Sequence, residues 1–256
     1  MSRSRNAVSR LRVALGTFVA LEAESGDPRT SEEGITAAFA AVARVERLMH
    51  PERPGSDIAV LSRSAPGTVV AVDAWTWAVL SLCRRLHRLS DGAFDPCLSL
   101  SPGRMSDIEL LDSGQVCTHA PVKVDLGGVA KGYAVDRAVE AMRAGGCHAG
   151  LVNAGGDLAV FGASSRTMFC RSESGSVVAV ELTEAALASS DTENLARPDE
   201  HQGYYHGRDR QTPISGSVCV TAPSAAVADA LTKCLLAADR GSGQTLLQAF
   251  GARRVP

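Results

Sequence analysis

The chain has 256 residues, of which 45% are hydrophobic and 21% are charged, the usual mixture for a globular protein with a sizeable core. Its formal net charge of −2 argues against an extended basic surface for nucleic acid or membranes, and its aromatic content of 4% argues against stacking platforms for single strands. Seven cysteines are scattered without a Cys-x-x-Cys pair. We therefore expect reduced, mostly buried thiols rather than a disulfide framework or a zinc site.

The N-terminal region has two interpretations, because a basic start is followed by an apolar run. This pattern is typical of a short signal peptide, but it also fits a tail followed by a first strand. We favour the tail and strand, since the apolar run is short and contains Gly16 and Thr17. The sequence thus predicts a disordered tail at residues 1–10, a strand at 11–23 and a cytoplasmic protein without a membrane anchor of its own, with the periplasm as the alternative.

Hydrophobic periodicity, helix caps and turn residues predict the remaining elements in chain order. Helices are expected at residues 31–49, 57–61, 74–89, 130–144, 225–235 and 244–250. Strands are expected at 67–72, on both sides of a turn at 112–114, and at 122–126, 149–153, 158–161, 167–171, 177–182 and 217–221. Residues 90–96 and 191–210 are predicted to be loops. Because helices and strands do not alternate strictly, the α+β class is favoured over a doubly wound α/β fold.

The stretch 124–162 carries two double-glycine turns, at 127–128 and 155–156, beside charged residues. The first turn comes just before a predicted helix, where free N–H groups and the helix dipole favour an anion such as phosphate. Lys131 adds a positive charge in the first helical turn. The pattern is neither a dinucleotide fingerprint nor a Walker loop. The acidic residues beside the two turns are Asp125 and Asp157.

Four motifs follow one another along the chain: SDGAFDP at 90–96, DLGGVAKGYAVD at 125–136, LVNAGGD at 151–157 and VADALTK at 227–233. With the Gly-Thr-Phe of residues 16–18, they resemble the ApbE family of FAD:protein FMN transferases, and the resemblance covers nearly the whole chain. It implies a single two-lobed, T-fold-like α+β domain over residues 11–256, with mixed, largely antiparallel sheets, packed helices and FAD in the cleft between the lobes.

The resemblance also implies an activity. Members of this family are Mg²⁺-dependent enzymes that split the diphosphate of FAD, attach FMN by a phosphoester to a threonine or serine of an acceptor protein, and release AMP. FAD is then a substrate, Mg²⁺ the cofactor, and an acceptor flavoprotein the partner. A cation would draw charge off the diphosphate oxygens, and Mg²⁺ prefers oxygen ligands. Two alternatives remain open: an Mg²⁺-dependent FAD pyrophosphatase that yields FMN and AMP, and a FAD-binding protein without turnover.

Site residues are carried over by matching the motifs. The metal would be held by the main-chain carbonyl of Gly128 and the carboxylate of Asp229. The base for the acceptor hydroxyl would be His206, in the polar loop. The residues that the resemblance places on FAD are Ala93, Phe94, Asp95, Asp125 and Lys131.

The third metal ligand is open, because the chain departs from the family pattern at this point. The family has a threonine four residues after the aspartate, whereas Thr232 lies three residues after Asp229 and Lys233 occupies the fourth position. Thr232 could still serve as the ligand, since positions i and i+3 share one helix face. Lys233 could instead occupy the metal site or reach a phosphate. His206 is matched by position alone, since the proline of the family motif is missing.

Overall fold

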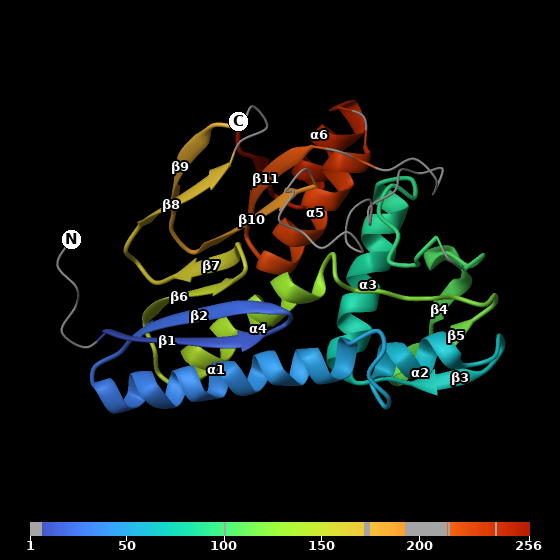
Figure 1. Cartoon of the computed structure of the whole chain (residues 1–256), viewed down its shortest axis with the longest axis horizontal. Helices are drawn as coiled ribbons and strands as arrows, with labels where there is room; N and C mark the ends of the chain where they lie inside the picture. The colour runs from blue at the N-terminus through green and yellow to red at the C-terminus, as the bar shows by residue number, and fades with distance from the viewer. Residues whose placement is uncertain (1–6, 100, 172–174, 193–213, 215, 239) are drawn as a thin grey trace.

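The structure is a computed structural model that describes residues 7–99, 101–171, 175–192, 214, 216–238 and 240–256 (Figure 1). Its helices are α1 (Pro28–Met49), α2 (Asp57–Arg63), α3 (Ala74–Leu89), α4 (Ala130–Ala144), α5 (Ala225–Ala237) and α6 (Arg240–Ala249). Its strands are β1 (Ala7–Ala14), β2 (Thr17–Glu24), β3 (Val69–Ala71), β4 (Ile108–Leu110), β5 (Gln115–Thr118), β6 (Ala149–Ala154), β7 (Asp157–Phe161), β8 (Arg166–Arg171), β9 (Val177–Leu182), β10 (Ala185–Asp191), β11 (Ser217–Ala222) and β12 (Arg253–Arg254).

The main sheet has seven strands in the order β1-β2-β6-β7-β10-β11-β12, and each neighbouring pair is antiparallel. Helices α1, α4 and α5 pack on one face of this sheet, α1 against β1 and β2, α4 against β6 and β7, and α5 against β10 and β11. The hairpin β8–β9 contacts β11 and closes a smaller core. The α+β class predicted from the sequence is therefore confirmed.

Strand β7 shows how the two cores are separated. Its alternate residues point to opposite faces, so Ala159 and Phe161 join the large core under the helices, while Leu158 and Val160 join the small core. All residues of β7 are buried. The strand that follows the second double-glycine turn is thus enclosed on both sides, and the side chain at its first position, Asp157, lies on the helix-covered face.

A smaller group of elements lies at one end of the molecule (Figure 1). It contains α2 and the three-stranded sheet β3-β5-β4, with α3 between this group and the main sheet. Buried residues from both groups belong to one continuous hydrophobic cluster. All seven cysteines are buried and free, as the scattered spacing predicted. Among the described residues, no helix is long and apolar enough to cross a membrane.

The N-terminal prediction needs correction in two places. The first strand begins at Ala7, inside the predicted tail, and the predicted strand at 11–23 is a hairpin. Leu15 and Gly16 adopt φ values of 55° and 69°, which close the turn between β1 and β2. Helix α1 also begins before Ser31, because the Asp27 side chain caps it by accepting a hydrogen bond from the Thr30 N–H at 3.0 Å.

Two further predictions differ from the structure. Residues 122–126 form no strand, and their one ladder contact is an isolated bridge between Cys97 and Val124. Strand β10 was not predicted, because its sequence AALASSD lacks the β-branched and aromatic residues that indicate strands. Asp191, the first residue of the predicted loop at 191–210, is the last residue of this strand. Residues 193–210 lie outside the described part of the chain.

Candidate active site

The predicted phosphate site lies where the chain enters α4. The Asp125 carboxylate accepts a hydrogen bond from the Gly127 N–H at 2.6 Å, and the Leu126 carbonyl accepts from the N–H groups of Val129 and Ala130 at 2.9 and 2.8 Å. The N-cap residue Val129 gives the helix no side-chain cap. The positive end of the α4 dipole is therefore stabilised by groups from other parts of the fold.

Helices α4 and α5 cap each other. Asp229 of α5 accepts a hydrogen bond from the Gly132 N–H in the first turn of α4 at 3.1 Å. Asp136 of α4 accepts hydrogen bonds from the N–H groups of Ala225 and Ala226, the first residues of α5, at 2.7 and 2.9 Å. The two helices approach so closely that a Cβ on Gly132 would lie 2.2 Å from the Ala225 carbonyl oxygen. This contact fixes Asp229 beside the N-terminus of α4.

Four charged side chains meet at this helix end. Lys131 of α4 forms an ion pair with Asp157, and Lys233 of α5 forms an ion pair with Asp229 one helical turn earlier. Asp157 reaches Lys131 because it lies on the helix-covered face of β7, as Ala159 does. The exposed fraction is 1% for Asp157, 0% for Asp229 and 8% for Lys233, so these are buried charges that need their partners.

The pKa values of Asp157 and Asp229 are shifted in opposite directions. Burial and the nearby Asp229 carboxylate raise the pKa of Asp157, and Lys131 offsets this only in part. Burial also acts to raise the pKa of Asp229, but the charges of Lys233 and Lys131 outweigh it and lower that pKa. The pair of lysines therefore keeps Asp229 ionised inside a site from which water is largely excluded.

Two hydroxyl groups extend the cluster toward the sheet. Thr232 donates a hydrogen bond from Oγ1 to the main-chain carbonyl of Asp229 at 2.6 Å, and its Oγ1 lies 2.7 Å from Oγ of Ser190. Ser190 lies on β10 at the parity of Ala188, which belongs to the helix-covered core. The Thr232 hydroxyl proton is thus donated within α5. The contact between Ser190 and Thr232 joins this helix to β10 behind the charged cluster.

Gly128 lies within contact distance of both Lys233 and Phe94. A Cβ on Gly128 would lie 3.6 Å from Cγ of Lys233 and 3.7 Å from Cε2 of Phe94. The Phe94 side chain is buried, while Ala93 next to it is half-buried. His87 of α3 holds this loop through its Nδ1, which lies 2.9 Å from the Phe94 carbonyl oxygen. The SDGAFDP loop therefore places an aromatic ring beside the helix end that carries the charges.

The Asp95 carboxylate is directed into its own loop. Its Oδ1 accepts hydrogen bonds from the N–H groups of Cys97 and Met105 at 2.9 and 3.1 Å, and its Oδ2 lies 3.6 Å from Nδ1 of His87. Asp95 thus shapes the loop that presents Phe94.

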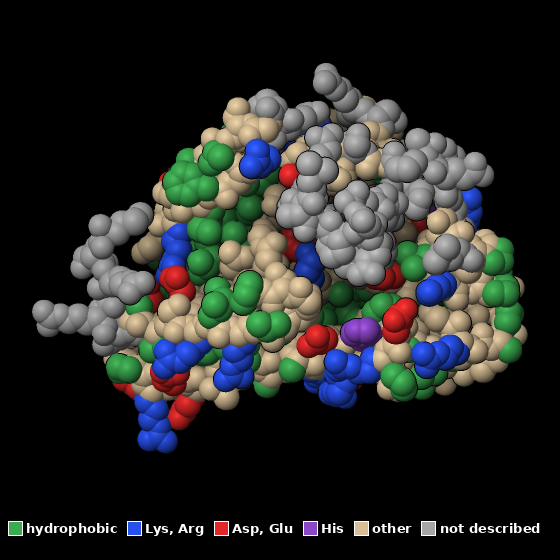
Figure 2. All heavy atoms as spheres, in the orientation of Figure 1, with side chains coloured by type: hydrophobic (Ala, Val, Ile, Leu, Met, Phe, Trp, Pro, Cys, Tyr) green, Lys and Arg blue, Asp and Glu red, His purple; other side chains and the backbone are tan. Residues whose placement is uncertain are grey.

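The structure brings most of the predicted residues together, at the junction of α4, α5 and the SDGAFDP loop. Phe94, Gly128 and Lys131 meet Asp229 and Thr232 there. Asp125 lies at the turn into α4, three residues before Gly128. His206, the predicted base, lies outside the described residues. Figure 2 shows charged side chains of both signs near the centre of one face of the molecule, beside hydrophobic ones.

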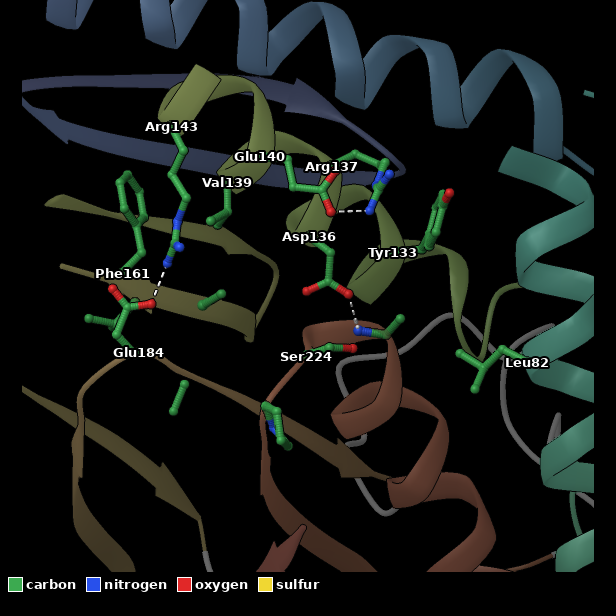
Figure 3. Close-up of a pocket in the computed structure, with 15 residues that line it drawn as sticks. Leu82, Tyr133, Asp136, Arg137, Val139, Glu140, Arg143, Phe161, Glu184 and Ser224 are labelled. Carbon is green, nitrogen blue, oxygen red and sulfur yellow. Dashed lines mark hydrogen bonds and ion pairs between the residues drawn. The ribbon is translucent and has the colours of Figure 1, made fainter. Parts of the chain in front are cut away.

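A separate cavity of about 460 Å³ lies along a different face of α4 (Figure 3). Tyr133, Arg137 and Arg143 line it, together with residues of β7 and the start of α5. Its charges are paired, Arg137 with Glu140 and Arg143 with Glu184. No residue that the sequence predicted for the FAD or metal site lines this cavity. We therefore assign the candidate active site to the helix end and not to the cavity.

The donor set at Asp229 does not fit Mg²⁺. One carboxylate oxygen of Asp229 is paired with the Lys233 ammonium and the other accepts the Gly132 N–H. The Thr232 hydroxyl donates its hydrogen bond to the Asp229 carbonyl within its own helix. Among the described residues, no group of three or more His, Cys, Asp or Glu side chains could hold a metal ion. Mg²⁺ needs several oxygen ligands and its own charge compensation, and here an ammonium already neutralises the carboxylate.

The sequence model of the ApbE family matches residues 15–102 and 99–254. A flavinyl transferase ApbE from Pseudomonas stutzeri, in its apo form, shares the fold with a TM-score of 0.81 at 20% identity, over 96% of this chain and 89% of that one. The flavin transferase ApbE from Vibrio cholerae gives 0.79 at 17%, over 96% and 91%. An ApbE protein from Thermotoga maritima gives 0.77 at 24%, over 90% and 86%. No curated protein matches the sequence.

The family match spans nearly the whole chain, so the chain belongs to the ApbE family, as its four motifs predicted. The sequence analysis missed the part that Asp157 and Ser190 play in the site. Asp157 ends the LVNAGGD motif beside a double-glycine turn, and this position was the available signal. The role of Ser190 depends on β10 lying beside β7.

Proposed function

We propose that this protein transfers FMN from FAD to the hydroxyl of a threonine or serine in an acceptor protein and releases AMP. Membership of the ApbE family supports this, as does the likeness in fold to the flavin transferases of Pseudomonas stutzeri and Vibrio cholerae. The observation that carries the proposal is the convergence of Lys131 and Lys233 at the N-terminus of α4, with Phe94 beside them.

The proposed reaction is a displacement at phosphorus. The acceptor hydroxyl oxygen attacks the phosphorus of the FMN half of FAD, the bond from that phosphorus to the bridging oxygen breaks, and AMP leaves with the bridging oxygen. The hydroxyl proton passes to a base, for which His206 remains the prediction. The diphosphate carries two negative charges, so fixed positive groups that stabilise the developing charge supply most of the catalysis.

The described residues divide this work. The N-terminus of α4 offers the positive end of its dipole to the phosphates, and Lys131 adds a full charge in the first turn. Phe94 presents an apolar ring to the flavin or the adenine, in a loop that Asp95 and His87 hold in place. Mg²⁺ has no part in this proposal, because the donors at Asp229 are already used by Gly132 and the Lys233 ammonium.

The test is a transfer assay with the full chain, FAD and a recombinant acceptor domain that carries a target threonine. We expect flavin fluorescence that stays with the denatured acceptor and AMP in equal amount, and neither product when the acceptor threonine is replaced by alanine. Free FMN with AMP would instead identify a pyrophosphatase, and intact bound FAD would identify a binding protein. Either result would overturn the proposal.

The lysine contribution can be measured in the same assay. Lys131→Met should lower the rate of transfer by about a hundredfold, because one preformed charge is removed from the phosphate site. Lys123→Met is the matched control, since Lys123 is exposed on the segment before the turn, and its rate should equal that of the wild type. Equal rates in the two variants would exclude Lys131 from the site.

A further inference from the structure

Lys233 lies where a cation is needed. Its ammonium is paired with the Asp229 carboxylate, and both side chains are buried, with 8% and 0% of their surface exposed. The stem of Lys233 passes beside Gly128, at the helix end where we place the diphosphate of FAD. A buried ammonium at this point is costly unless it balances negative charge. Its position therefore indicates that it compensates negative charge in the site.

The charge balance of the cluster shows what this compensation achieves. With both aspartates ionised, the two positive charges of Lys131 and Lys233 balance the two negative charges of Asp157 and Asp229. A neutral residue at position 233 would leave the cluster with one negative charge, which would repel a diphosphate. The Lys233 ammonium therefore supplies the compensation that a bound cation would otherwise provide.

The chain's use of lysine points to the same role. Of its 26 basic residues, only Lys123, Lys131 and Lys233 are lysines, and the remainder are arginines. Two of the three thus lie in this cluster, Lys233 buried and Lys131 half-buried. An ammonium is a compact point charge with three donors, whereas a guanidinium is a planar fork that needs more room. A lysine can therefore fill the space of an ion beside Gly128 where an arginine could not.

We propose that the Lys233 ammonium takes the place of a divalent cation in this site, so that the protein binds the diphosphate of FAD without metal. This inference rests on the proposed function, since it concerns the same FAD site. The ammonium bridges the Asp229 carboxylate and a phosphate oxygen, while Lys131 and the N-terminus of α4 bind the remaining phosphate charge. Lys233 is thus a substrate-binding residue of the site.

The first test uses the wild-type protein and needs no variant. The affinity for FAD is measured by fluorescence titration in EDTA and in millimolar Mg²⁺. We expect the two dissociation constants to agree within about twofold, because the cation is part of the chain. A dissociation constant that rises about tenfold or more in EDTA would overturn the inference.

Two substitutions at the same position separate charge from metal ligation. Lys233→Thr provides a hydroxyl ligand beside Asp229, and Lys233→Met provides an uncharged side chain of similar length. In EDTA both should bind FAD about tenfold or more weakly than the wild type, because a charge-assisted contact is lost. Mg²⁺ should restore the affinity of Lys233→Thr alone. Lys123→Thr is the control and should behave as the wild type in both buffers.

Calorimetric titration with Mg²⁺ alone distinguishes a failure of this inference from a failure of the proposed function. Lys233→Thr should bind Mg²⁺, and the wild type and Lys233→Met should not. If no protein binds FAD in any buffer, the proposed function fails and the Mg²⁺ titration still decides the role of Lys233. Mg²⁺ binding by the wild type, or its absence in folded Lys233→Thr, would overturn the inference.

Discussion

Asp229 has a structural role that a metal ligand would not need. Its carboxylate accepts the N–H of Gly132 in α4 and neutralises the Lys233 ammonium within its own helix. Both oxygens are therefore committed inside the protein, in a position with no exposed surface. Removing one partner of such a pair leaves an uncompensated buried charge, which costs more than the pair itself contributes.

This predicts a large loss of stability from a small change. Asp229→Asn should lower the free energy of unfolding by about 3–5 kcal/mol, because the buried Lys233 ammonium loses the charge of its carboxylate partner. Urea denaturation measures this, and the loss should be equal in EDTA and in Mg²⁺. The double variant Asp229→Asn/Lys233→Met should recover a large part of it, since its asparagine can still accept the Gly132 N–H. An Asp229→Asn protein as stable as the wild type would contradict the pairing.

For each of two interactions in the site, the sequence motifs identified one of the two residues. Lys131 and Thr232 were identified from their motifs, but their partners Asp157 and Ser190 were not given a role in the site. These partners come from β7 and β10, and their approach depends on strand register rather than on local sequence. Asp95 shows the converse: its motif placed it on FAD, whereas its carboxylate is used to hold its own loop.

Helices α4 and α5 cross closely because the residue at their crossing point is a glycine. Gly132 allows the two backbones to approach, and the mutual caps at Asp136 and Asp229 satisfy N–H groups at both helix starts. A side chain at this point would separate the helices and move Lys131 away from Asp157.

Gly132→Ala should therefore destabilise the protein, although alanine favours helices. The added Cβ would meet the Ala225 backbone oxygen at 2.2 Å, and such overpacking costs about 1–3 kcal/mol, more than the propensity gain of about 1 kcal/mol. Gly26→Ala is the matched control, since its Cβ would meet no atom within 4 Å. Unfolding by urea should show a loss for the first variant and little change for the second. The opposite order would exclude close packing of the two helices.

The cap of α3 gives a prediction that depends on pH. The Asp73 carboxylate accepts the Trp75 N–H at 2.9 Å and lies 2.8 Å from Arg44. Burial acts to raise the pKa of Asp73, but the Trp75 hydrogen bond and Arg44 outweigh it and keep the pKa below its usual value. A lowered pKa contributes stability above the unfolded value, and this contribution is lost as the pH falls through the folded pKa.

Asp73→Ala should accordingly lose about 1–2 kcal/mol of stability at pH 7. The difference from the wild type should shrink below about pH 4, where the carboxyl becomes protonated. Asp73→Asn should lose less, because asparagine also caps helices. Thermal or urea unfolding across this pH range measures both effects. A difference that stays constant down to pH 2 would show that the Asp73 charge is not involved.

Elements were predictable from the sequence where local signals agreed. Helix α4 was predicted with its observed bounds, because its periodic pattern lies between two glycine pairs. The strand predicted at residues 122–126 was wrong. Buried and exposed residues do alternate there, but the segment forms only an isolated bridge and no ladder. Strand β10 was missed, because burial under α5 and pairing with β7 and β11 stabilise it in place of intrinsic propensity.

For the whole molecule, the motifs predicted the family and its fold, whereas periodicity predicted only the separate elements. The α+β class followed from the mixture of elements, but the order β1-β2-β6-β7-β10-β11-β12 had no local signal. Non-local pairing depends on long-range packing of both sheet faces, which a single sequence does not reveal. The order matters for function, because it brings Asp157 of β7 and Ser190 of β10 under the crossing of α4 and α5.

Binding of FAD should also be visible in global stability. A ligand that binds only the folded state stabilises it in proportion to the logarithm of its concentration over its dissociation constant. FAD at about a hundredfold excess over that constant should therefore add about 2.7 kcal/mol, in EDTA as in Mg²⁺. Thermal unfolding with and without FAD measures this shift, and riboflavin, which lacks the diphosphate, should stabilise less. Equal stabilisation by riboflavin would contradict a phosphate site.

The most direct measurement uses the chain's three lysines as probes. NMR of protein labelled with ¹³C only at lysine should show the side chains of Lys123, Lys131 and Lys233, assigned by Lys→Met substitution of each in turn. Addition of FAD in EDTA should shift the signals of Lys131 and Lys233 and leave Lys123 unchanged. If FAD binds and the signals of Lys131 and Lys233 do not move, the diphosphate is not held at the N-terminus of α4.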